Sequence, residues 1–261
     1  MQTRIEAPTQ EPLSLGETAV AAHGAGRTYR SRKRVVPALS GVELDVRGGE
    51  VVAVVGPSGC GKSTLLELFA GLQTPDEGRV KGGGLEECAF MPQRDLLLPW
   101  RDGLGNAALA LECKGVGRAE ARRRAAPLFE RFGLAEFERS YPRELSGGMR
   151  QRVAFLRTLL AGRPVLLLDE PFAALDSITR ASMQEWLAEA LASERRTVVL
   201  VTHDVEEALF LADRVAVMSP RPGRVVAELP VPFERPRPRR ETVTSREFAE
   251  LKERALEALG Q

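Results

Sequence analysis

The sequence predicts an α/β fold with a parallel β-sheet at its core, an antiparallel β subdomain and an inserted helical subdomain. Short apolar runs such as Val51–Val55 and Val165–Leu168 alternate with stretches that favour helix, which is typical of parallel strands buried on both faces. Between about residues 101 and 161 the sequence changes character, and Ala, Arg, Glu and Leu dominate Arg118–Phe132. That composition favours helices and indicates an insertion.

The amino-terminal part begins with a polar stretch that contains proline. We expect residues 1–14 to form a loose tail, as chain ends commonly do. The β-branched runs at Val42–Val46 and Glu50–Val55 flank a turn at 47–49, which predicts a hairpin. Short strand candidates follow in the Gly-rich stretch 74–90.

The remaining elements follow from apolar periodicity and from stop signals such as Gly71 and Gly162. The pattern predicts helices over 62–71, 118–132, 147–161, 178–192 and 205–212, strands over 165–168, 197–202 and 215–218, and a hairpin to about 229. We therefore expect one domain over 15–229, in which the helical subdomain occupies about 95–161.

Residues 230–261 form a separate carboxyl-terminal segment. Its first part is rich in Arg and Pro between Phe233 and Arg240, and its second part has apolar residues at helical spacing, namely Phe248, Leu251, Leu256 and Leu259. One interpretation is a solvated linker followed by a docking helix. The other, which the sequence favours less, is a basic patch that meets lipid headgroups or a membrane partner.

Composition excludes several classes of protein. The 37 Lys and Arg residues nearly balance the 36 Asp and Glu residues, giving a net charge of +1, so a general nucleic-acid binder is not expected. No apolar run approaches the ~18 residues that span a bilayer, and the first residues lack the apolar region of a secretory signal. The three cysteines have no metal-ligand spacing. We expect a soluble cytosolic protein of one or two domains.

A phosphate-binding loop follows the first buried strand. Residues 56–64 match the P-loop pattern between strand Val51–Val55 and the helix over 62–71. Glycines let backbone N–H groups surround an anion, and the helix N-terminus adds its positive dipole end. Lys62 can reach the β- and γ-phosphates, and Ser63 can ligate Mg²⁺. The predicted ATP-binding residues of this loop are Gly56, Pro57, Ser58, Gly59, Cys60, Gly61, Lys62, Ser63 and Thr64.

Two carboxylates follow the apolar run Val165–Leu168. A buried strand of an α/β sheet delivers such residues to its carboxyl end, where ligands bind. Asp169 is placed to hold Mg²⁺ through water. Glu170 is placed to orient or deprotonate an attacking water, which is the role of a general base.

A second candidate anion site lies at Leu145-Ser-Gly-Gly-Met149. Ser146 is a good N-cap for the helix over 147–161, and the backbone of Gly147 and Gly148 is available to an anion. One ATP needs only one such phosphate-binding site from its own chain. Two of them in one sequence indicate that each ATP is bound by one site of one copy and by the other site of a second copy. Here the sequence resembles the ATP-binding subunits of ABC transporters, whose signature is Leu-Ser-Gly-Gly-Gln. Met149 departs from that signature and affects only peripheral contacts.

Four further residues match motifs of that family in order, so that the resemblance covers about residues 15–229. Tyr29 occupies the position where the family stacks an aromatic ring on adenine. Gln93 matches the glutamine that ligates Mg²⁺ and links the site to the membrane subunit. Asp176 matches the loop that crosses the dimer interface, and His203 matches the switch histidine that senses the γ-phosphate. The resemblance implies a P-loop NTPase fold with a RecA-like parallel sheet.

The resemblance also implies a mechanism. Two copies would form a head-to-tail homodimer, in which each ATP lies between one P-loop and the partner's signature, and ATP would favour the closed form because only there does it contact both subunits. Hydrolysis would reopen the dimer. The implied groups are a catalytic set of Glu170, His203 and Lys62, a set acting in trans of Ser146, Gly147, Gly148 and Asp176, and Mg²⁺ ligands from Ser63, Gln93 and Asp169.

The stretch 91–100 resembles the nitrate, sulfonate and taurine importer group, as does 169–176, and residues 94–100 are also similar to pyrimidine-precursor importers of the thiamine pathway. This resemblance implies a subunit that energises import of a small anionic or organic solute. Its partners would be separate transmembrane permease subunits and a periplasmic or lipoprotein solute-binding protein, and it would lie on the cytoplasmic face of the inner membrane. The residues do not encode the solute.

Other functions remain open. An ATPase of an export or lipid-handling ABC complex would share the same catalytic residues. A non-transport ABC ATPase, such as a DNA-repair enzyme, would usually carry a coiled-coil or zinc insertion between the P-loop and the signature, and a P-loop kinase would lack Ser146–Gly148. A scaffold that does not hydrolyse ATP would be expected to lose Glu170 or His203, and both are present.

Overall fold

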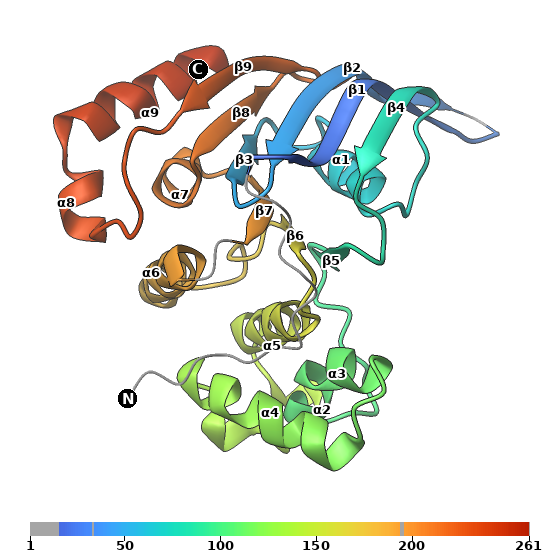
Figure 1. Cartoon of the computed structure of the whole chain (residues 1–261), viewed down its shortest axis with the longest axis vertical. Helices are drawn as coiled ribbons and strands as arrows, with labels where there is room; N and C mark the ends of the chain where they lie inside the picture. The colour runs from blue at the N-terminus through green and yellow to red at the C-terminus, as the bar shows by residue number, and fades with distance from the viewer. Residues whose placement is uncertain (1–15, 33, 194–195, 261) are drawn as a thin grey trace.

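The computed structural model describes residues 16–32, 34–193 and 196–260. Two β-sheets form one end of the molecule and a group of helices forms the other (Figure 1). The expected amino-terminal tail lies outside the described residues. Within the described part, no helix is both long enough and apolar enough to cross a membrane.

The central sheet has six strands in the order β5-β6-β7-β3-β8-β9. All neighbouring pairs are parallel except β8 and β9, which are antiparallel. This arrangement confirms the predicted parallel core. The strands are β3 (Val51–Val55), β5 (Cys88–Met91), β6 (Val165–Asp169), β7 (Thr197–Thr202), β8 (Arg214–Met218) and β9 (Val225–Pro230).

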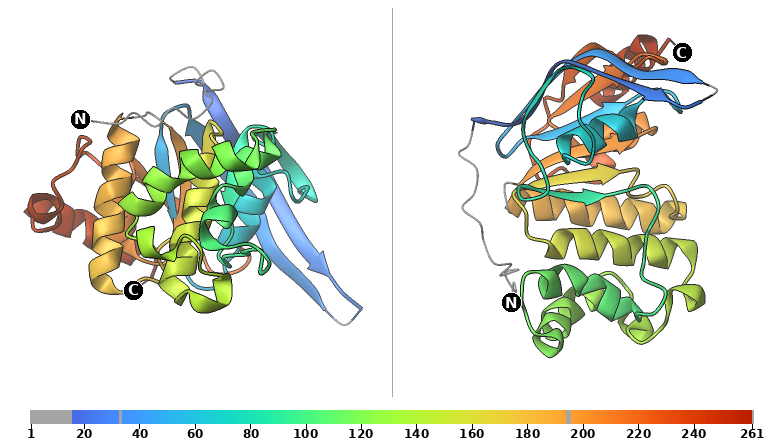
Figure 2. Two further views of the ribbon diagram at one scale, coloured as in Figure 1. Left: turned by 90° about the horizontal axis from the view of Figure 1, so that it is seen from below. Right: turned by 90° about the vertical axis from the view of Figure 1, so that its right-hand side faces the viewer.

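A second, antiparallel sheet has the order β2-β1-β4. Its strands are β1 (Thr18–Arg30), β2 (Val35–Arg47) and β4 (Glu77–Gly82), and the long β1–β2 hairpin projects from the body (Figure 2). The predicted hairpin across the turn at 47–49 is wrong, because β2 pairs with β1 while β3 pairs with β7 and β8. The side chains of β3 are buried on both faces, which favours the middle of the large sheet.

Strand β3 separates two apolar cores. Val51, Ala53 and Val55 enter the core shared with the helical side of the molecule, whereas Val52 and Val54 enter the core beneath the antiparallel sheet. Successive side chains of a strand point to opposite faces. The loop that follows β3 is therefore held from both sides, and helix α1 (Lys62–Phe69) begins directly after it.

The helical subdomain lies between β5 and β6 in sequence. It consists of α2 (Gly103–Ala107), α3 (Leu109–Cys113), α4 (Arg118–Arg131), the 3-10 turns η1 (Ala135–Phe137) and η2 (Pro142–Glu144), and α5 (Gly147–Leu160). Phe132 joins it to helix α6 (Ser177–Ser193), since its ring centroid is 4.4 Å from that of Trp186.

The carboxyl-terminal segment folds back onto helix α7 (Val205–Leu211) and strand β9 (Figure 1). It contains α8 (Arg239–Val243) and α9 (Arg246–Ala258), and α9 buries Phe248, Leu251 and Ala255. The expected solvated linker before these helices is wrong at Arg237, which is only 5% exposed. Its guanidinium is turned inward toward carbonyl oxygens of α7.

Candidate functional site

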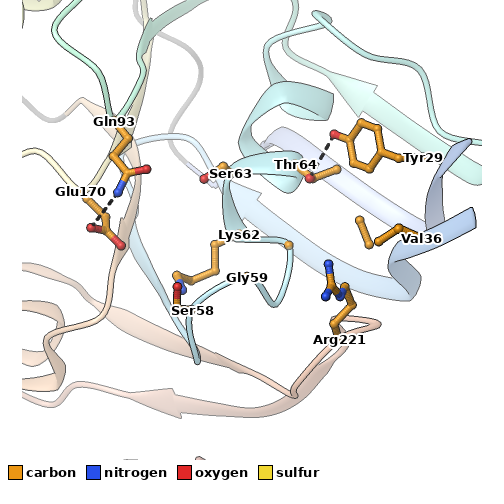
Figure 3. A pocket seen from close by; sticks show the side chains of 12 residues that line it. Tyr29, Val36, Ser58, Gly59, Lys62, Ser63, Thr64, Gln93, Glu170 and Arg221 are labelled. Carbon is orange, nitrogen blue, oxygen red and sulfur yellow. Dashed lines mark hydrogen bonds between the residues drawn. The ribbon is translucent and has the colours of Figure 1, made fainter. Parts of the chain in front are cut away.

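A cavity of about 240 Å³ opens where α1 begins, near the carboxyl ends of β3 and β6 (Figure 3). This edge is where parallel α/β sheets bind ligands. The two sheets and the hairpin between β8 and β9 contribute its walls. It is lined by Tyr29, Val36, Ala38, Ser58, Gly59, Gly61, Lys62, Ser63, Thr64, Gln93, Glu170 and Arg221.

The loop between β3 and α1 has the backbone geometry of an anion cradle. Gly61 is the N-cap of α1 and has φ 111°, and no side chain caps the helix there. A Cβ at Gly61 would lie 2.7 Å from the carbonyl oxygen of Ala38, so a larger residue would push the loop away from β2. The uncapped N–H groups of the first turn are therefore free to bind an anion.

Lys62 is held close to this loop. Its Nζ donates to the carbonyl oxygen of Gly56 at 2.7 Å and to that of Pro57 at 3.1 Å, and the residue is 6% exposed. Gly56, Pro57 and Cys60 do not line the cavity, and they shape the loop from behind it. The same loop thus forms the anion cradle and holds the Lys62 ammonium group beside it.

Asp169 ends strand β6 and is 4% exposed. Burial raises the pKa of this carboxyl above its ordinary value, and a hydrogen bond from Ser63 opposes the shift. A buried carboxylate with too little positive charge around it favours either a proton or a cation. Asp169 and Ser63 therefore form a pair of oxygen groups suited to a small divalent ion.

Glu170 follows in an unusual backbone conformation, with φ 49°. Such left-handed residues other than glycine are strained and often occur at functional sites. The Glu170 backbone N–H donates to the carbonyl oxygen of Val201 at 2.9 Å, which ties it to β7. Its carboxylate accepts from Gln93 Nε2 at 3.3 Å and lies 3.4 Å from His203 Nδ1. The structure thus brings Glu170, Gln93 and His203 together.

Tyr29 lies near the end of β1, on the side of the cavity opposite Glu170 (Figure 3). Its hydroxyl is 3.2 Å from Thr64 Oγ1, and Arg27 lies over its ring at 5.6 Å. The residue is 36% exposed. A half-exposed aromatic ring on a cavity wall is available to stack on a flat ligand.

Arg221 is a lining residue that the sequence motifs do not reveal. It lies in the turn between β8 and β9, and no described residue forms an ion pair or side-chain hydrogen bond with its guanidinium. The turn is fixed against the cradle, because Gly223 N donates to Ala38 O at 2.8 Å and a Cβ at Gly223 would collide with the Cys60 carbonyl oxygen. Only the packing of this turn against the P-loop could have identified Arg221.

Ser146, Gly147, Gly148 and Asp176 do not line this cavity. Ser146 is the N-cap of α5 and accepts from Met149 N at 3.2 Å, as predicted. Ser146 and Gly147 are exposed, and Asp176 is an exposed residue that accepts from Thr179 N at 3.0 Å. The second candidate cradle therefore lies on the surface of the chain, apart from the first.

The donor groups fit Mg²⁺ better than they fit a metal held by protein alone. No group of three or more His, Cys, Asp or Glu side chains within the described ranges could hold a metal ion. Mg²⁺ is commonly bound by one or two carboxylates, with water and substrate phosphates as the other ligands. Asp169, Ser63 and Gln93 offer such a sparse oxygen set beside an anion cradle.

Comparisons with known proteins agree with this geometry. A family model described as "ABC transporter" matches residues 39–173. The taurine import ATP-binding protein TauB of Chromobacterium violaceum is 49% identical over 205 residues, which cover 76% of this chain and 78% of that protein. The formylaminopyrimidine import ATP-binding protein ThiZ of Halalkalibacterium halodurans is 47% identical and covers 78% of this chain and 81% of its own length.

A longer match is the aliphatic sulfonates import ATP-binding protein SsuB 1 of Rhodococcus jostii, which is 45% identical over 91% of this chain and 92% of that protein. Among solved structures, a dimeric, post-hydrolysis state of an ATP-binding cassette bound to ADP and Pi has a TM-score of 0.75 and is 31% identical. That match covers 82% of this chain and 100% of the other. The chain therefore belongs to the ABC transporter family and is one of its ATP-hydrolysing, ATP-binding subunits.

Proposed function

We propose that this chain is the ATP-hydrolysing subunit of an importer for a small organic solute that carries a sulfonate group or a pyrimidine ring. The observation that carries the proposal is the set of close relatives, which are named as import proteins for taurine, aliphatic sulfonates and formylaminopyrimidine. The cavity at the start of α1, with its Gly-rich cradle and Lys62, supports the ATP-binding role.

In this proposal the nucleotide spans the cavity from Tyr29 to the P-loop. Adenine stacks on the Tyr29 ring, and the phosphates lie against the N–H groups at the start of α1. Lys62 exchanges its contacts with the Gly56 and Pro57 carbonyl oxygens for phosphate oxygens, which form stronger, charge-assisted hydrogen bonds. Arg221 adds a second cation on the open side of the cavity.

Glu170 is the proposed general base for the attacking water. Its carboxylate lies between Gln93 and His203, each of which approaches one of its two oxygens. His203 is 64% exposed at its side chain, which leaves it free to turn toward a γ-phosphate. A positioned base of this kind contributes roughly 10²–10⁴-fold to a rate.

Ser63, Asp169 and Gln93 are the proposed Mg²⁺ ligands. When bound, the ion would neutralise charge on the phosphates. The buried Asp169 carboxylate would gain the positive charge that its surroundings lack, as its raised pKa indicates.

The signature residues act, in this proposal, on the ATP of a second copy. Ser146, Gly147 and Gly148 are separate from the cavity of their own chain, and Ser146 and Gly147 are exposed at the start of α5. A head-to-tail homodimer would bring each signature onto the partner's cavity. The similar cassette that was solved as a dimer supports the formation of a dimer.

The proposed partners are separate transmembrane subunits and a solute-binding protein, with this chain on the cytoplasmic face of the membrane. The names of the related import proteins support this role.

The decisive experiment reconstitutes the full chain, with the membrane proteins that co-purify with it, into vesicles. Labelled taurine, an aliphatic sulfonate and formylaminopyrimidine are tested as solutes. Import predicts that ATP drives one of these solutes toward the side that holds the cassette. Glu170→Gln should abolish this movement, whereas Glu247→Gln, at an exposed position on α9, should not. Movement away from the cassette side would contradict import and support the export alternative.

A further inference from the structure

Helix α7, which begins two residues after His203, is held by arginines of the carboxyl-terminal segment. At its carboxyl end, Arg237 Nη1 donates to the carbonyl oxygens of Leu209 at 3.2 Å, Phe210 at 2.8 Å and Ala212 at 2.8 Å. These are the groups that a helix end leaves without intrahelical partners. The Arg237 guanidinium therefore caps the carboxyl end of α7.

Arg239 contacts α7 near both of its ends. Its Nη2 donates to Glu206 Oε1 at 3.3 Å, and its guanidinium lies over the Phe210 ring at 5.0 Å. Lys252 on α9 donates to the other oxygen of Glu206 at 3.1 Å. Both sides of the Glu206 carboxylate are thus bound by the carboxyl-terminal segment.

Arg239 is also linked to Glu207, through the side chain of Gln184. Arg239 Nη1 donates to Gln184 Oε1 at 2.7 Å, and Gln184 Nε2 donates to Glu207 Oε2 at 2.9 Å. Gln184 lies on α6 and is 1% exposed. Because Arg239 occupies the amide oxygen, the amide nitrogen must face Glu207, so the orientation of Gln184 is fixed.

Glu207 connects this series of hydrogen bonds to the catalytic centre. It is 4% exposed and lines a small cavity together with Glu170, Thr202 and His203. Burial raises its pKa to about 7. Within the described residues its Oε1 lacks a hydrogen-bond partner, so the Gln184 amide, which donates to Oε2, is a main contact of this carboxyl, together with the neighbouring Thr202 hydroxyl and the positive charge of Arg180.

We propose that Arg239 is a positioning residue for hydrolysis, acting through Gln184 and Glu207 to hold the segment that carries His203. The inference rests on the proposed function, since it assigns the carboxyl-terminal segment a part in the turnover of the same site. Arg239 touches neither the nucleotide cavity nor His203 itself, so its effect should fall on the rate of hydrolysis and not on ATP binding.

The test compares Arg239→Ala with Arg240→Ala in the full chain, because Arg240 is the exposed neighbour in the same short helix. We expect Arg239→Ala to lower kcat for ATP about tenfold, since small displacements of catalytic groups carry such losses. KM for ATP and ATP affinity should stay unchanged. Arg239→Lys, which retains a charged donor, should recover part of the rate, and Arg240→Ala should match the unmodified chain.

A double-mutant cycle tests the route. If Arg239 acts through Gln184, then Arg239→Ala combined with Gln184→Leu should be no slower than Gln184→Leu alone. Multiplied losses would overturn the proposal, as would a normal kcat in Arg239→Ala. A parallel loss of kcat, ATP binding and Tm would show a merely structural role and would also overturn it.

Amide hydrogen exchange provides a readout that does not need turnover. The proposal predicts faster exchange over residues 203–211 in Arg239→Ala and in Gln184→Leu than in Arg240→Ala. Unchanged exchange in both variants would contradict it. If the unmodified chain bound ATP but never hydrolysed it with its membrane partners, the proposed function would fail, and the exchange experiment would still decide whether Arg239 positions this segment.

Discussion

Two helix N-termini in this molecule have the form of phosphate-binding sites, and they differ in how complete they are. Helix α1 begins at Gly61 with no side-chain cap, so its first N–H groups are free, and Lys62 lies beside them. Helix α5 begins at Ser146, whose hydroxyl already accepts from Met149 N. The N–H groups at the start of α1 are therefore available to a bound anion. At the start of α5, the Met149 N–H is already hydrogen-bonded to the Ser146 hydroxyl, and an anion would have to replace that contact.

Their surroundings differ in the same direction. The α1 terminus lies in a cavity whose walls include Tyr29, Glu170 and Arg221. The α5 terminus is exposed at Ser146 and Gly147, and none of its signature residues lines that cavity. A dipole end alone binds an anion weakly, because the effect is screened by solvent. The contrast supports the proposal that the α1 terminus binds the ATP of its own chain, whereas the α5 terminus acts together with a second copy.

The largest expected effect falls on the complete site. Lys62→Ala removes a buried cation from the cradle, and we expect ATP affinity to fall about 10–100-fold, since charge-assisted hydrogen bonds are worth roughly 1.5–3 kcal/mol. Lys81→Ala, at an exposed position on β4, is the matched control and should bind ATP normally. Equilibrium titration with a fluorescent ATP analogue measures both. Equal ATP affinities in Lys62→Ala and Lys81→Ala would contradict the claim that the α1 terminus is the complete phosphate site.

An intermediate effect is expected at the incomplete site. Ser146→Ala should leave ATP affinity of the single chain unchanged and lower turnover roughly tenfold, because the lost hydroxyl would act only in the dimer. The variant also loses an N-cap worth about 1 kcal/mol. Ser245→Ala corrects for that loss, because Ser245 caps α9 and accepts from Phe248 N at 3.2 Å. A weaker ATP affinity in Ser146→Ala alone would place this residue in its own chain's site.

The smallest effect is expected for Arg221. It is exposed, so its attraction for the phosphates is screened, and Arg221→Gln should weaken ATP binding by about two- to fivefold. High salt should reduce the difference. Arg224→Gln alters an exposed arginine of the same hairpin, outside the cavity lining, and serves as the control. Identical titrations for the two variants would exclude Arg221 from the nucleotide site.

Local patterns predicted much of the fold and most of the cavity. The β3–α1 unit with its P-loop, the buried strand ending at Asp169 and the N-cap at Ser146 are each defined by residues close together in sequence. The structure places Tyr29, Gln93 and Glu170 around one cavity. These predictions succeed because each motif carries its own backbone requirement.

The misses are long-range. The run 42–46 and strand β3 look like a hairpin, yet their partners lie elsewhere in the chain, and no local signal specifies them. Arg221 enters the cavity only because its turn packs on the P-loop. An Arg-rich sequence does not reveal which arginines are buried. Arg123 pairs with Glu120 on an exposed helix face, whereas Arg237 is buried against α7. Burial depends on the packing of distant elements and cannot be read from charge alone.

The most direct test of the account is the mass of the Glu170→Gln variant in solution with Mg²⁺ and ATP, measured by light scattering during size exclusion. The two unequal helix termini predict a particle of two chains that retains ATP, because ATP would bridge one P-loop and the partner's signature and would not be hydrolysed. Adding Ser146→Glu, which places a negative charge at the α5 terminus, should return it to one chain. A Glu170→Gln chain that binds ATP and stays a monomer would contradict the account.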